Sequence, residues 1–171
     1  MKNSLFLVAI LIIASCSCKK SATQVQTMKL SGNCPKDGTC IIQLLKNKSM
    51  EVKTDDFGKT YYNLIESTTQ NVIRYTYSRT VKGNLQDAGY REEIIFEESN
   101  DSKNIALTNE SLQKTKMLFG RFCFCRGQTG YYKVNHGNLI ILQKTKEKTA
   151  SLDFKIDEVP QIINHIDFAL K

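Results

Sequence analysis

The chain has 171 residues, enough for one domain of ordinary size but not for two. With 41% hydrophobic and 24% charged residues, its composition excludes a disordered or fibrous protein. The net charge of +7 favours anionic partners such as lipid headgroups or acidic glycans, although the lysines are scattered singly, as on an ordinary solvated surface.

The first 15 residues have the pattern of a secretory signal. Lys2 gives a positive start, Leu5 to Ile13 form an uninterrupted apolar run, and small residues follow. The run is too short for a permanent transmembrane helix, which needs about 20 residues. The segment Ile13-Ala14-Ser15-Cys16 resembles the lipobox of bacterial lipoproteins. This resemblance implies that the signal is cut before Cys16 and that Cys16 carries a diacylglycerol thioether and an acylated amine. Ordinary cleavage without lipid is the alternative.

The resemblance also implies a location in the cell envelope, because the acyl chains would anchor a soluble domain to a bacterial membrane outside the cytoplasm. Residues 16–23 are short and polar and would form the lipidated tether, followed by one globular domain over residues 24–171. Some bacterial surface lipoproteins share an acidic export stretch after the anchor. Here Ser17-Cys18-Lys19-Lys20 is basic, which favours the periplasmic side. No nucleic-acid partner is expected for such an exported domain without a recognition motif.

The domain is predicted to be mainly β, because short apolar or alternating segments are separated by turn signals. In one of them, Ile73, Tyr75 and Tyr77 share a face and polar residues occupy the other. We expect segments 61–66 and 71–79 to pair as a hairpin and residues 100–104 to form a loop. The expected strands cover residues 25–30, 40–45, 50–54, 61–66, 71–79, 90–98, 121–126, 131–134, 139–144 and 150–156.

Two helices are predicted to accompany these strands. An internal helix near residues 109–119 would have Thr108 as its N-cap and Gly120 just past its end. A C-terminal helix would follow Asp157, with Pro160 in its first turn. Its apolar stripe would comprise Val159, Ile162, Ile163, Ile166 and Ala169. The predicted fold is therefore a single antiparallel sandwich or barrel-like sheet with one internal and one C-terminal helix.

Cysteines are the most distinctive residues of the domain. Export to an oxidising compartment makes disulfides the default, and the candidates are Cys34, Cys40, Cys123 and Cys125. In a regular strand the Cα atoms of residues 123 and 125 are about 6.5–7 Å apart, so a bond between them requires a kinked backbone. The two connectivities that join the 34–40 loop to the 123–125 strand avoid this and are favoured slightly over two local pairs. They would close a loop of about 85–90 residues and stabilise the fold by roughly 4–5 kcal/mol.

Other chemistry at these cysteines is less well supported. The C-x-C pair lies beside Arg121 and Arg126, whose charges would stabilise a thiolate in a redox site, but no thioredoxin-like C-x-x-C is present. A zinc site from Cys123, Cys125 and His136 lacks an evident fourth ligand, so no metal and no cofactor is predicted. No hydrolase signature such as G-x-S-x-G or H-E-x-x-H occurs.

A binding function is favoured instead. Arg126, Gln128, Tyr131 and Tyr132 surround a glycine-flanked turn, and tyrosine and arginine are enriched at binding hot spots. The alternative is that strand alternation merely divides each tyrosine pair between core and surface. We expect a membrane-anchored lipoprotein that acts as a non-catalytic binding or structural module, with another envelope protein or an anionic glycan as partner. An envelope thiol-redox protein using Cys123 and Cys125, or a hydrolase assembled from distant strands, is the enzymatic alternative.

Overall fold

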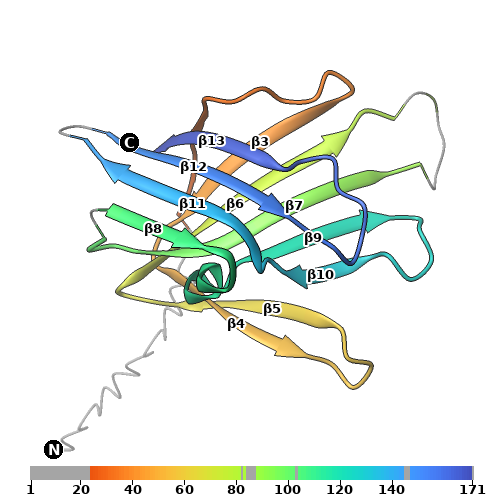
Figure 1. Ribbon diagram of the computed structural model, residues 1–171, viewed down its shortest axis with the longest axis horizontal. Coiled ribbons are helices and arrows are strands. Elements are labelled where there is room, and N and C mark those ends of the chain that lie inside the picture. The colour runs from red at the N-terminus through yellow and green to blue at the C-terminus, as the bar shows by residue number, and fades with distance from the viewer. Residues whose placement is uncertain (1–23, 82, 84–87, 103, 145–146, 171) are drawn as a thin grey trace, which may run out of the picture.

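The computed structural model describes the chain from residue 24 to residue 170, apart from residues 82, 84–87, 103 and 145–146. The predicted signal peptide and tether, including Cys16, lie outside the described residues. The described chain forms two antiparallel sheets that pack face to face, with the smaller sheet in front of the larger in Figure 1. The prediction of a mainly β protein is confirmed.

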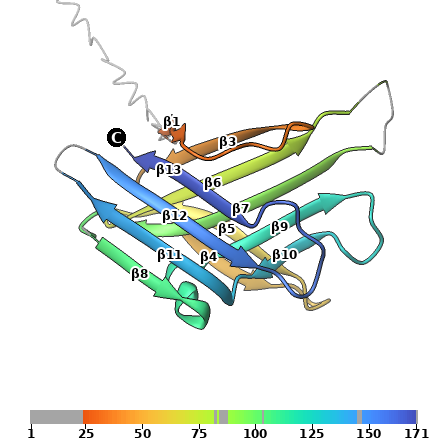
Figure 2. The ribbon, with the colours of Figure 1, turned by 45° about the horizontal axis from the view of Figure 1, so that its top comes forward.

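The larger sheet has eight strands and the smaller has five. In spatial order the larger sheet contains β1 (Val25–Thr27), β3 (Gly38–Leu45), β6 (Gln70–Arg79), β7 (Tyr90–Ser99), β9 (Leu118–Cys123), β10 (Gly130–Lys133), β5 (Thr60–Glu66) and β4 (Lys48–Thr54). The smaller contains β2 (Lys29–Leu30), β13 (His165–Leu170), β12 (Lys148–Lys155), β11 (His136–Gln143) and β8 (Asn104–Thr108). Figure 2 shows the two layers from a second direction.

The main core lies between the sheets and follows the alternation of their strands. Ile73, Tyr75 and Tyr77 of β6 all point into it, as predicted, and Ile94 and Phe96 of β7 join them. Their partners across the layer come from the inner faces of β11, β12 and β13. The side chains of one face are thus apolar and buried, which fixes the register of each strand.

A second, smaller core lies on the opposite face of the larger sheet. The sheet curls so that β4 contacts β6 and β7, and Met50 of β4 packs there with Val72, Ile95 and Leu118. Strand β7 is consequently buried on both faces, which explains its consecutive Ile94-Ile95-Phe96 run.

Four glutamates of β7 are buried among these apolar side chains, and each has partners. Glu92 accepts hydrogen bonds from the backbone N–H groups of Ile162 and Ile163, at 2.6 and 2.8 Å, and from the Tyr90 hydroxyl. Glu93 accepts hydrogen bonds from the hydroxyls of Tyr62 and Tyr131. Glu97 accepts them from Ser49 and Lys116, and Glu98 accepts one from Lys148. Among the described residues, every buried side-chain nitrogen or oxygen has a hydrogen-bond partner. The buried charge is therefore compensated within the fold.

The internal helix is shorter and tighter than predicted. It is a 3₁₀ helix, η1 (Asn109–Thr115), preceded by Thr108, and it ends at Lys116, whose φ is 52°. The predicted terminator Gly120 instead lies within β9, where an added Cβ would be 2.7 Å from the rings of Phe122 and Tyr131. Gly120 is thus required by side-chain packing and not by a helix end.

The predicted C-terminal helix is wrong. Residues 156–164 form an irregular segment, and β13 follows, paired with β12 and β2. The side chain of Gln161 binds the N–H of Ile156 and the C=O groups of Phe154 and Ile163, so it takes backbone groups that a helix would pair internally. The edge of β12 then gains a strand whose alternating residues fill the core.

Three details of strand pairing also differ from prediction. Segments 61–66 and 71–79 do not form a hairpin: β5 pairs with β4 and β10, whereas β6 pairs with β3 and β7. The first predicted strand is divided at Met28 into β1 and β2, which belong to different sheets. Strand β8 was not predicted.

We expect Glu92→Gln to lower the free energy of unfolding by about 2–3 kcal/mol, because the carboxylate is buried and charge-assisted hydrogen bonds of this kind are lost. Urea denaturation would measure the loss, and hydrogen exchange should show faster exchange at the amides of Ile162 and Ile163. Glu158→Gln, which removes an exposed carboxylate in the same segment, is the matched control. Equal stability of the two variants would contradict this role of Glu92.

Candidate functional site

The four cysteines of the domain form two local disulfides. Cys34 bonds to Cys40, with Cα atoms 5.7 Å apart, and Cys123 bonds to Cys125, with Cα atoms 5.1 Å apart. The slightly favoured connectivities between the two regions are wrong. Strand β9 ends at Cys123 and the chain bends at Phe124, which supplies the kinked backbone that a Cys123–Cys125 bond requires.

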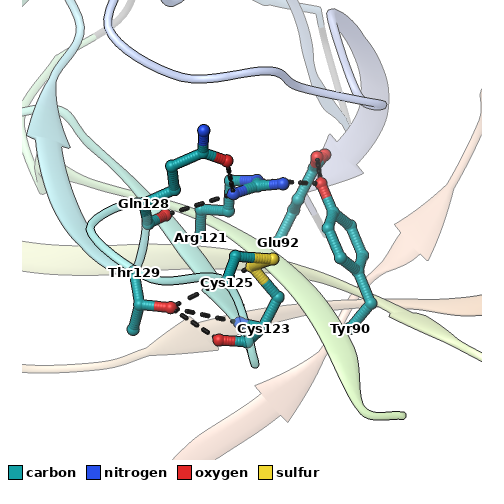
Figure 3. The surroundings of a disulfide bond; sticks show 7 residues. All are labelled: Tyr90, Glu92, Arg121, Cys123, Cys125, Gln128 and Thr129. Carbon is teal, nitrogen blue, oxygen red and sulfur yellow. Dashed lines mark hydrogen bonds between the residues drawn. A yellow bond between two sulfur atoms is a disulfide. The ribbon is translucent and has the colours of Figure 1, made fainter.

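The turn after Cys123 is closed by hydrogen bonds (Figure 3). The Thr129 hydroxyl donates to the C=O of Cys123 at 2.7 Å, as Figure 3 shows. In addition, the N–H of Gln128 donates to the C=O of Cys125 at 3.2 Å. Gly127 has a φ of 75°, a conformation that favours glycine. Residues 124–129 are thus held between β9 and β10 as one compact turn, which we call the disulfide turn.

Arg121 connects this turn to β7. Its guanidinium donates to the side-chain oxygen of Gln128 at 2.9 Å and lies 5.4 Å from the centre of the Tyr90 ring. The guanidinium of Arg79 lies 4.8 Å from the same ring, so Tyr90 contacts two arginines. Burial, and then the hydrogen bond to Glu92, raises the pKa of Tyr90. Arg121 is only 7% exposed, which makes it a structural residue of the turn and not a surface cation.

A groove lies on the β7 side of the disulfide turn. The residues that line it include Arg79, Tyr90, Arg91, Phe122 and Phe124, and we call it the Arg91 groove. The Arg91 guanidinium lies over the Phe122 ring, 4.2 Å from its centre, and Phe124 is 81% exposed. Among the residues that the structure describes, no acidic side chain lines this groove.

The four residues predicted to bind a ligand do not form one cluster. Arg126 is exposed at the tip of the turn, whereas the side chain of Gln128 is engaged by Arg121. The Tyr131 hydroxyl donates to Glu93 at 2.9 Å, and Tyr132 packs against the main core. Burial, and then the charge of Glu93, raises the pKa of Tyr131.

A second groove lies on the other side of the turn, beside β10. Its lining includes Tyr131 and Tyr132 together with Lys59, Gly127 and Thr129. We call it the Lys59 groove. The two grooves therefore flank the disulfide turn, and ligand binding by Arg126, Gln128, Tyr131 and Tyr132 stays a prediction.

Both grooves lie at one end of the larger sheet, which we call the apical end. The register pairs Tyr90 with Cys123 at this end and Val25 with Leu45 at the other. The β4–β5 turn, residues 55–59, is also apical, because Thr60 pairs with Tyr131. Figure 1 shows these turns on the right, and Figure 2 shows β1 on the opposite side.

The disulfide turn and the β4–β5 turn each carry an exposed phenylalanine. Phe57 is 88% exposed and Phe124 is 81% exposed, the two highest values among the large hydrophobic residues described. Neither was singled out from the sequence, nor was Arg91. The available signal was a large apolar residue inside a polar turn pattern, as in Asp55-Asp56-Phe57-Gly58.

The two histidines bind aspartates of the smaller sheet or its loops. His136 lies 3.3 Å from Asp157, whereas His165 Nδ1 lies 2.6 Å from Asp153 and its Nε2 lies 2.8 Å from Asp167. Within the described ranges no group of three or more His, Cys, Asp or Glu side chains is arranged to hold a metal ion.

Comparisons with known proteins give no relative from which to transfer a function. No protein-family model matches the chain, and no curated protein or solved structure matches it. Over the part of the chain that the structure describes, no helix is long and apolar enough to cross a membrane.

The His165 contacts predict a pH dependence of stability. The hydrogen bond to Asp167, and then that to Asp153, raises the pKa of His165. Because this pKa is higher in the folded than in the unfolded state, the stabilisation is complete below about pH 6.5 and is lost as the pH rises through the folded value. Urea unfolding at pH 6 and pH 9 should show lower stability at pH 9, and a smaller difference in His165→Gln.

His136→Gln, which changes the other histidine of the chain, is the control and should keep the wild-type pH difference. A His165→Gln variant with the full wild-type difference would show that other groups cause it.

Proposed function

We propose that the protein is a bacterial lipoprotein of the cell envelope, anchored through an acylated Cys16 and facing the periplasm. The lipobox-like segment Ile13-Ala14-Ser15-Cys16 supports the anchor, and the basic residues after Cys16 support the periplasmic side. Residues 1–15 are the cleaved signal, residues 16–23 the tether and residues 24–171 the domain. The partner of the anchor is the membrane itself.

The domain is proposed to be a non-catalytic binding module that uses its apical end. The observation that carries this is the pair of exposed phenylalanines, Phe57 and Phe124, on neighbouring turns beside two grooves. Large exposed aromatic side chains offer apolar surface to a partner, and grooves beside them offer shape. The buried carboxylates of β7 and both histidines are engaged in internal contacts, which favours a structural use of these groups.

Lipidation is tested directly at the cysteine. Cells expressing the full chain and fed an alkyne analogue of palmitate should yield a labelled protein that pellets with membranes. Cys16→Ser should abolish the label and release the protein, because the thioether has no attachment site. Mass spectrometry of the N-terminal peptide would identify the modification.

Cys18→Ser is the matched control and should keep the label. If Cys18 were the lipidated cysteine, Ser15 would occupy the aliphatic position of the lipobox, where serine fits poorly. An unlabelled wild-type chain beginning at residue 16 would instead identify a secreted protein without an anchor.

A thiol-redox function is the second candidate, favoured by the position of the Cys123–Cys125 pair at the rim of an exposed turn near Arg121 (Figure 3). In this reaction a thiolate of a dithiol protein attacks one sulfur of the pair and forms a mixed disulfide. The partner's second thiol then resolves it, so the partner is oxidised and Cys123 and Cys125 become thiols.

We expect the binding module to keep this disulfide. In a native glutathione titration, both pairs should remain oxidised near −200 mV, about the potential of an oxidising compartment. Alkylation and non-reducing peptide mapping would read each pair separately, with Cys34–Cys40 as the internal reference. Selective reduction of Cys123–Cys125 in the folded protein would instead support the redox candidate.

A further inference from the structure

We propose that the Arg91 groove binds an acidic peptide segment that also carries an aromatic or aliphatic side chain, supplied by a partner protein of the envelope. This inference rests on the proposed binding function and names its site and the chemistry of its partner. It adds Arg91, Phe122 and Phe124 to the residues expected to bind.

The cation of this groove is held ready for a carboxylate. The Arg91 guanidinium lies over the Phe122 ring at 4.2 Å, and that ring is held in turn by an edge contact with Tyr131 at 5.3 Å. A guanidinium placed over an aromatic ring still has N–H groups that can donate to the two oxygens of a carboxylate. Arg91 is exposed and has no ion-pair partner among the described residues, whereas Arg79 is paired with Asp37.

The apolar part of the ligand follows from Phe124. Its ring is 81% exposed in a turn that is fixed by the Cys123–Cys125 bond and by Thr129. An aromatic side chain has few rotatable bonds, so on a fixed turn it loses little conformational entropy on binding and offers a large apolar contact. Phe124 and Arg91 line the same groove, which therefore combines cationic and apolar surface.

A peptide fits this surface better than a glycan. Sugars stack on open aromatic faces, and Phe124 offers such a face in this groove, but Arg91 covers one face of Phe122 and Tyr90 contacts Arg79 and Arg121. The exposed Phe57 and Phe124 lie on neighbouring turns, and a groove lies on each side of the disulfide turn. A peptide segment can present a carboxylate to Arg91 and an aromatic or aliphatic side chain to Phe124, whereas an acidic glycan supplies anionic groups but no such side chain.

The test uses the full chain in detergent micelles and fluorescence anisotropy with a dye-labelled copolymer of glutamate and tyrosine. Polyglutamate and heparin serve as comparison probes. We expect the copolymer to bind more tightly than either, and Arg91→Ala to weaken its binding about tenfold, which corresponds to loss of one charge-assisted contact. Arg91→Lys should recover only part of the affinity, because ammonium lacks the planar fork.

Two variants control for charge and for apolar area. Lys46→Ala removes one exposed cation near β1, at the far end from the groove, and should change affinity less than twofold. Phe124→Ala should weaken copolymer binding several-fold, whereas Leu142→Ala, at a half-exposed leucine of the smaller sheet, should not. Equal effects of Arg91→Ala and Lys46→Ala would overturn the proposal, because binding would then follow net charge alone. Arg91-dependent binding of heparin in preference to the copolymer would also overturn it, in favour of an anionic glycan.

A photo-crosslinking amino acid at Phe124 in cells separates this inference from the proposed function. Protein adducts together with copolymer binding support both. Adducts without copolymer binding leave the binding module intact and overturn the acidic-peptide inference. Failure of both experiments overturns both.

Discussion

The carboxylate of Glu92 is the contact on which the C-terminal part of the fold depends. It is 1% exposed and accepts hydrogen bonds from the amides of Ile162 and Ile163, which cross from the smaller sheet toward the larger. A buried charge is costly without partners, and backbone amides without partners are costly as well. Each compensates the other here, so the irregular segment 156–164 is held in one place and β13 can return along β12. The same carboxylate accepts the hydroxyl of Tyr90, the residue between Arg79 and Arg121 at the apical end.

Burial of β7 on both faces explains why this strand combines a fully apolar centre with acidic ends. Its neighbours β6 and β9 cover its edges, the smaller sheet covers one face, and β4 contacts the other face. The glutamates at its ends therefore point into the two cores, where hydroxyls, amides and lysines from later or earlier strands surround them. Paired carboxylates of this kind, adjacent in sequence but on opposite faces, cannot act together on one substrate.

The strands could be predicted from the sequence because most have one apolar face, and period-2 alternation is a local signal. Their pairing could not: the 61–66 and 71–79 segments are neighbours in sequence and belong to the same sheet, yet β5 pairs with β4 and β10, whereas β6 pairs with β3 and β7. The C-terminal segment has apolar residues at helical spacing and at strand spacing alike, since Ile166 and Phe168 are both buried. Long-range partners, Glu92 and the edge of β12, decide between the two. At the candidate site, the sequence drew attention to the disulfide turn but could not show which of its aromatic residues remain exposed.

The short span of both disulfides says what they stabilise. A bond that closes a loop of about seven residues, such as Cys34–Cys40, contributes about 2 kcal/mol in the chain-entropy model, roughly half of what a bond between the two regions would contribute. Both pairs lie at the apical end, since Cys40 pairs with Tyr77 of β6 and Cys123 pairs with Tyr90 of β7. They therefore restrict the apical turns more than they hold the sheets together, which their two cores and compensated glutamates already do. Turns that are ordered before a partner binds lose less conformational entropy on binding. Local disulfides at the apical end therefore suit a binding surface in which the backbone that carries Phe124 is fixed in advance beside Arg91.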